Sequence, residues 1–132
     1  MKGQNQFKID SMIHEISSLK EDTFKVLELF DLSQRLSDES NFDQAMNFSN
    51  EVLCLSERLN YKAGILEASS QIGNLNSLKY KYSEALQYYY KALNIAEELN
   101  VQLRVASILG SIGLIYKDQV ITKLLMNIIT EH

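Results

Sequence analysis

Apolar residues recur every three or four positions along almost the whole chain, which is the spacing of amphipathic helices. The first such stripe consists of Ile9, Met12, Ile13, Ile16 and Leu19. Together with the polar segments between the stripes, this spacing predicts helices at about 7–19, 24–37, 42–59, 61–78, 82–99 and 101–117. No proline and only five glycines are present in 132 residues, so few positions interrupt a helix. We therefore predict an all-α fold of six or seven helices in antiparallel pairs.

Several helix ends carry residues that suit them. Asp22 or Thr23 offers a side-chain oxygen as the N-cap of the second helix. Asn60 and Asn100 follow the last apolar residues of their helices. Because asparagine tolerates the left-handed conformation in which many helices end, we expect each of them to terminate its helix.

A shift of forty residues aligns the chain with itself. Identical residues stand in both copies at Ala45/Ala85, Leu53/Leu93, Glu57/Glu97, Leu59/Leu99, Asn60/Asn100, Ile72/Ile112 and Gly73/Gly113. A fixed period with helical spacing inside each copy is typical of stacked helical repeats. In the preceding copy, Ser33 occupies the glycine position and Ser49 the position of Tyr89, so we interpret it as a degenerate first repeat.

Small residues mark the expected contacts between paired helices. Gly73 and Ala85 are predicted as the points where two antiparallel helices approach closely, with the ring of Tyr89 filling the space beside them. Gly113 is expected to allow the same close packing in the next copy. This arrangement resembles a tetratricopeptide (TPR) helical hairpin, although the period of forty residues is longer than the usual length of about 34.

The repeat pattern predicts one domain over residues 1–132. It divides into an N-terminal helix at 7–21, a degenerate repeat 1 at 22–60, repeat 2 at 61–100, and a truncated repeat 3 or cap at 101–132. The tail carries an apolar stripe of Ile121, Leu124, Leu125, Ile128 and Ile129. On the forty-residue shift Leu125 aligns with Ala85 and Ile129 with Tyr89, which predicts a shortened second helix. We expect it either to cap the stack or to form a homodimer through the C-terminal helix.

Composition excludes several function classes. A net charge of -4 argues against nucleic-acid binding, which needs clustered Lys and Arg. No run approaches the ~18 apolar residues of a membrane span, and the N-terminus lacks the apolar core of a signal peptide, so we expect a cytoplasmic protein. Cys54 is the one cysteine and is expected to be a small buried hydrophobe. With only His14 and His132 besides, we predict no catalytic residues, no metal site and no cofactor.

From Ile9 to about residue 119 the chain resembles the TPR arrays at the input end of bacterial sensor histidine kinases and related regulators, especially of the Bacteroidetes type. The segments that carry the resemblance are IDSMIHEISSLKEDTFKV, LSERLNYKAGILEASSQIGN, YSEALQYYYKALNIAEELN and SIGLIYKDQ. The resemblance implies a right-handed superhelical solenoid of about three repeats. It also implies a protein-interaction scaffold or, alternatively, the input segment of a signalling protein whose output domain is absent. An extracytoplasmic location would follow if the chain were part of such a sensor.

In TPR stacks the first helix of each pair lines a concave groove that binds a peptide or a partner helix. Asn74 follows Gly73 at the position where peptide-binding TPR domains often use an asparagine amide. Ser70, Ser107 and Ser111 stand where such domains carry the Lys and Arg of a carboxylate clamp, so a chaperone C-terminal tail is not the expected ligand. The alternative is that these are merely tolerated polar residues of a concave surface. The predicted groove residues are Phe30, Gln34, Glu67, Ser70, Asn74, Ser77, Ser107, Leu114 and Lys117.

Overall fold

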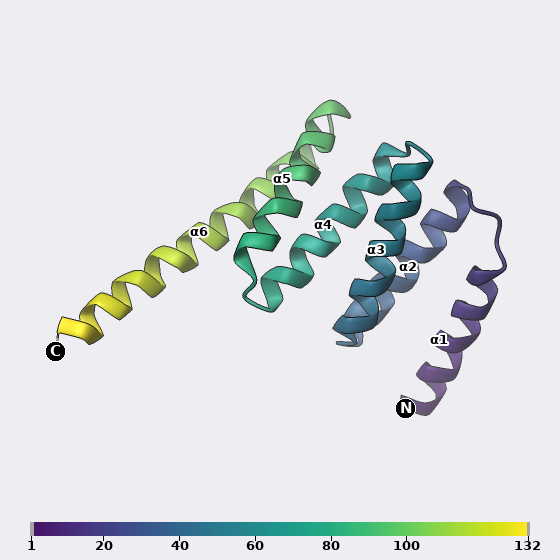
Figure 1. The fold of residues 1–132 in the computed structure, drawn as a ribbon, viewed down its shortest axis with the longest axis horizontal. Coiled ribbons are helices and arrows are strands. Elements are labelled where there is room, and N and C mark those ends of the chain that lie inside the picture. The colour runs from purple at the N-terminus through teal and green to yellow at the C-terminus, as the bar shows by residue number, and fades with distance from the viewer. Residues whose placement is uncertain (1, 132) are drawn as a thin grey trace.

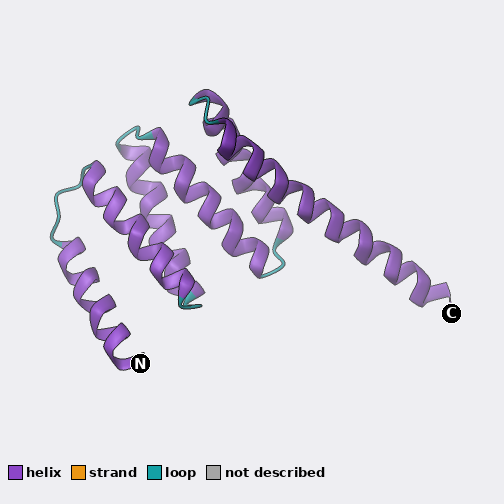
Figure 2. Cartoon of the chain, turned by 180° about the vertical axis from the view of Figure 1, so that it is seen from behind, coloured by secondary structure: helices purple, strands orange, loops and turns teal. Residues whose placement is uncertain are grey.

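The computed structural model describes residues 2–131, with side chains from Gln6 onward, and this part of the chain forms six α-helices and no strand. The helices are α1 (Lys2–Ser17), α2 (Thr23–Asp38), α3 (Phe42–Arg58), α4 (Lys62–Leu78), α5 (Tyr82–Glu98) and α6 (Gln102–Glu131). They follow one another in a row along the molecule (Figure 1), and the turns that join them alternate between its two edges (Figure 2). The all-α fold with a repeating helical arrangement is thereby confirmed.

The helices α2 to α5 end in the same way, at intervals of twenty residues. Each is followed by one residue with a positive φ: Ser40 (62°), Asn60 (54°), Tyr80 (59°) and Asn100 (59°). After α3, the Tyr61 N–H donates to the Ser56 carbonyl (2.8 Å) and the Asn60 N–H to the Glu57 carbonyl (3.1 Å). This pair of bonds is the Schellman motif, which satisfies the last carbonyls of a helix. The predicted helix ends at Asn60 and Asn100 are therefore confirmed.

The helix starts differ from the helix ends. Asp22 caps α2, because its carboxylate accepts the N–H groups of Phe24 (3.1 Å) and Lys25 (3.2 Å). Helices α3, α4 and α5 have no side-chain cap and begin directly after the preceding Schellman turn. Of the two predicted N-cap residues, Asp22 and Thr23, Asp22 is therefore the one that caps the helix.

The core consists of two apolar clusters that meet in α4. The first joins α1 to α4 and includes Leu32, Leu36, Val52 and Ile72, all at most 1% exposed. The second joins α4, α5 and α6 and includes Leu66, Ala85, Tyr89, Ala92 and Ile112. Helix α4 therefore packs on both sides and is the central element of the stack.

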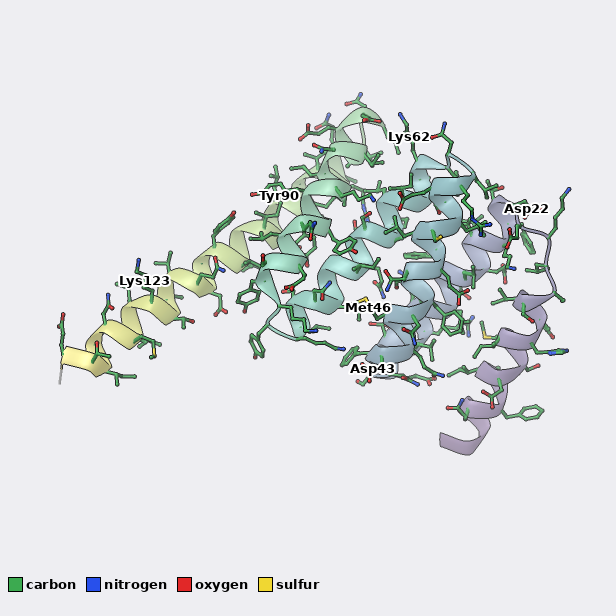
Figure 3. All side chains as sticks on the ribbon, in the orientation of Figure 1. Asp22, Asp43, Met46, Lys62, Tyr90 and Lys123 are labelled. Atoms are coloured by element: carbon green, nitrogen blue, oxygen red, sulfur yellow. The ribbon has the colours of Figure 1, made fainter. Side chains whose placement is uncertain are left out.

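Helix α6 departs from the prediction. Its C-terminal part does not fold back as a second helix but continues α6 in one helix from Gln102 to Glu131. Figure 1 shows this part extending away from the other five helices, and Figure 3 labels Lys123 on it. The twenty-residue interval places the next left-handed residue at Val120, and a β-branched side chain strongly disfavours a positive φ. Without a residue that can turn the chain, the helix continues.

Two further expectations are wrong, and one of the two alternatives for the tail does not hold. The tail does not cap the stack, since Leu124 and Ile128 are 57% and 56% exposed, and the alternative of a homodimer stays a prediction. Cys54 is exposed on α3, because the buried positions of that helix lie on either side of it at Leu53 and Leu55. Gly113 does not support close packing, since nothing lies within 4 Å of the place where its Cβ would be.

Candidate interaction site

The predicted groove residues come from α2, α4 and α6, and α4 lies between the other two. Helix α2 packs against α4, and Arg104 of α6 reaches α4 from the other side. The helices α2, α4 and α6 therefore lie side by side, with α4 in the middle.

The end of this surface near α2 is apolar and hollowed. Between α2 and α4 lies a cavity of about 90 Å³, and the structure brings Phe30 and Glu67 together in its wall. Most of the other residues around it are apolar: Val26, Leu27, Val52, Tyr61, Ala63 and Gly64. Gln34 is exposed on α2 and does not belong to this wall. A hollow of this size accommodates one small apolar side chain.

Arg104 is a site residue that the sequence analysis missed. Its Nη2 lies 3.2 Å from Oε2 of Glu67 and donates to Oγ of Ser70 at 3.1 Å. Ser70 is 8% exposed and lies beneath this contact, while Nε of Arg104 is buried without a partner in the described part of the chain. The sequence did contain a signal for this contact. Arg104 lies one helical turn before Ser107, and from there its long side chain reaches α4.

Asn74 is held by a residue of the core. The Tyr89 hydroxyl donates to Oδ1 of Asn74 at 2.6 Å, while the ring of Tyr89 is 4% exposed. Burial raises the pKa of the Tyr89 phenol, and the neighbouring hydroxyls of Ser111 and Ser77 partly offset this rise. The phenol therefore stays protonated and fixes the orientation of the Asn74 amide. The Nδ2 group of this exposed side chain makes no hydrogen bond within residues 6–131.

The site residues predicted on α6 are exposed, and their side chains bind none of the other described residues. Ser107, Leu114 and Lys117 lie on the surface of α6, and Leu114 is 67% exposed. Their side chains form no hydrogen bond or ion pair with any other described residue. The structure therefore joins Glu67 to Ser70 through Arg104, and places Asn74 and Ser77 around the Tyr89 hydroxyl, but leaves the α6 positions separate.

Comparison of the chain with family models, with curated proteins and with solved structures gave no match. The resemblance to TPR input regions of sensor kinases therefore stays a prediction. Among residues 2–131, none of the helices has the length and apolarity needed to cross a bilayer. The same part of the chain contains no group of three or more His, Cys, Asp or Glu side chains arranged to hold a metal ion.

Proposed function

We propose that the chain is a non-catalytic interaction module of the TPR type, which binds a peptide or a partner helix along the surface of α2, α4 and α6. In this proposal α2–α3 and α4–α5 are two repeats, and α6 begins a third, in a right-handed superhelix. The regular twenty-residue spacing of the helices supports it. The observation that carries the functional part is the bond from the buried Tyr89 to the exposed Asn74.

That bond gives the Asn74 amide a defined direction. A buried phenol usually finds a hydrogen-bond partner, but this one binds a side chain of the surface and thereby orders it. Since Oδ1 already accepts from Tyr89, the free Nδ2 is a donor for a ligand carbonyl. Ordering the amide in advance reduces the entropy that a ligand must offset on binding.

The surroundings specify the chemistry of the ligand. The hollow lined by Leu27 and Phe30 favours an apolar side chain at one end of the bound peptide. Arg104 is paired with Glu67, so the middle of the surface is close to neutral and does not require a ligand carboxylate. The preferred ligand is an extended or helical peptide with an apolar anchor and a backbone carbonyl at Asn74.

A selection of displayed random peptides on the immobilised full chain tests this function, followed by calorimetric titration of the selected peptides. Asn74→Ala is expected to weaken their binding about 2- to 13-fold, the effect of losing one hydrogen bond of about 0.5–1.5 kcal/mol. The matched control is Asn94→Ala, because Asn94 is exposed on α5, outside the proposed surface. Failure to select any peptide, or equal binding by Asn74→Ala and wild type, would contradict the proposal.

A further inference from the structure

The internal repeat shows which face of α6 lacks a neighbour. In α4, Leu66 and Gly73 pack against α5 and are buried. Forty residues later, Ala106 and Gly113 occupy the same positions of the repeat, and both are exposed. Leu109 is 50% exposed on the same face. Helix α6 therefore presents a face built for a packed helix, and no described part of the chain covers it.

This face continues into the projecting part of α6. Gly110, Gly113, Val120, Leu124 and Ile128 are separated by three, seven, four and four positions, which keeps them on one side of a helix. We name these five residues the α6 seam. Its first half consists of glycines, and its second half of side chains that are 56–58% exposed. The residues of the α6 seam therefore change from small to large in the direction of the C-terminus.

We propose that the α6 seam binds a second copy of this chain, with the two α6 helices packed antiparallel about a two-fold axis near Val120. Antiparallel pairing places the glycines of one copy opposite Leu124 and Ile128 of the other. The chain already uses this match of small against large where Gly73 receives the ring of Tyr89. A two-fold interface joins the same patch of both copies. The α6 seam has small residues at one end and large side chains at the other, so two antiparallel copies place small residues opposite large ones.

Several observations favour a second copy over the chain's own tail. Val120 stands where the earlier turns have a left-handed residue, so the tail does not fold back onto Gly113. The overlap runs from about residue 110 to 130 in each copy, so the two helices would pack along about 30 Å of their length. On one flank of the seam, Leu114 (67% exposed) would then meet Leu125 (54% exposed) of the other copy.

Sedimentation equilibrium of the full chain tests the association. Wild type is expected to be dimeric, and Leu124→Glu/Ile128→Glu monomeric, because four carboxylates would enter the apolar overlap. The matched control is Leu103→Glu: Leu103 is 86% exposed on the same helix but lies outside the overlap. It should leave the dimer intact, and circular dichroism should show all variants folded. A monomeric wild type at the highest attainable concentration overturns the proposal, and so does a dimer that survives the double substitution.

Cysteine cross-linking tests the direction of packing. In a Cys54→Ser background, Val120→Cys lies near the two-fold axis and is expected to form an intermolecular disulfide. Ile128→Cys is the control, because eight residues from the axis in each copy place the two cysteines about 24 Å apart, far beyond the ~7 Å that a disulfide spans. Cross-linking at both positions would indicate parallel packing, and cross-linking at neither would indicate another partner or none. Either result overturns the proposal.

Discussion

The ring of Tyr89 fills the space that a side chain at residue 73 would need. A Cβ atom at Gly73 would lie 2.7 Å from Cδ1 of Tyr89, closer than real Cβ contacts come. Gly113 occupies the same position of the next copy, yet its Cβ would meet nothing within 4 Å. Two glycines at identical places of the repeat therefore have opposite surroundings, which marks the end of the packed stack.

Alanine at these two glycines should change stability in opposite directions. In the monomeric Leu124→Glu/Ile128→Glu background, Gly113→Ala is expected to raise the free energy of unfolding by up to about 1 kcal/mol through helix propensity. Gly73→Ala gains the same helix propensity, but its methyl group crowds Tyr89 at a cost of about 1–3 kcal/mol. This substitution should therefore lower the free energy of unfolding. Urea unfolding measures both. Equal destabilisation by the two substitutions would mean that a helix covers Gly113 in the monomer.

Residue 120 decides the path of the tail. Val120→Asn restores a residue that tolerates the left-handed conformation, as Asn60 and Asn100 do. The tail is then expected to fold back onto α6, and the chain to become a compact monomer with slowed amide exchange at Gly113. Val120→Ala is the control, because alanine favours the uninterrupted helix. If Val120→Asn sediments like Val120→Ala, the identity of residue 120 does not set the path.

Tyr82 reports the docking of α6 through its pKa. Its hydroxyl donates to the carboxylate of Asp118, and this bond is the main reason that the pKa of Tyr82 rises from 10.0 to about 12. The folded state keeps this proton at a pH where the unfolded chain has lost it. The contribution of the bond is therefore fully present below pH 10 and is lost as the pH rises through about 12.

Asp118→Asn should move this titration back toward the ordinary tyrosine range. The phenolate absorbance of the folded chain measures it, and Tyr82→Phe identifies which phenol of the seven tyrosines is responsible. An unchanged titration curve in Asp118→Asn would show that the Tyr82–Asp118 contact between α5 and α6 does not persist in solution.

Local signals allowed much of the fold to be predicted from the sequence. The apolar spacing placed a helix at 82–99, and the structure has Tyr82–Glu98. Asn60 and Asn100 marked their helix ends, because asparagine is one of the few residue types that readily adopt the left-handed conformation. The contact of Gly73 with Tyr89 was also predicted, since a glycine on one helix of an antiparallel pair leaves room for an aromatic ring of the other.

The errors arose where tertiary context decides. The tail was expected to fold back because the forty-residue period was extended past Val120, whose side chain opposes the turn. Arg104 was missed because it acts through a long side chain that crosses to the preceding first helix. The interpretation of Ser33 and Ser49 as signs of a degenerate repeat stays a prediction; both side chains are fully buried, which their polarity alone did not indicate.

The distance between residues 109 and 129 within one chain tests the central claim that α6 is straight and leaves its face open. Spin labels at Leu109→Cys and Ile129→Cys, in a Cys54→Ser chain diluted into excess unlabelled protein, report this distance by pulsed electron resonance. Twenty residues of continuous helix at 1.5 Å each predict a separation of about 30 Å. A separation near the ~8–10 Å between packed helices would show that the tail folds back, and would contradict the account.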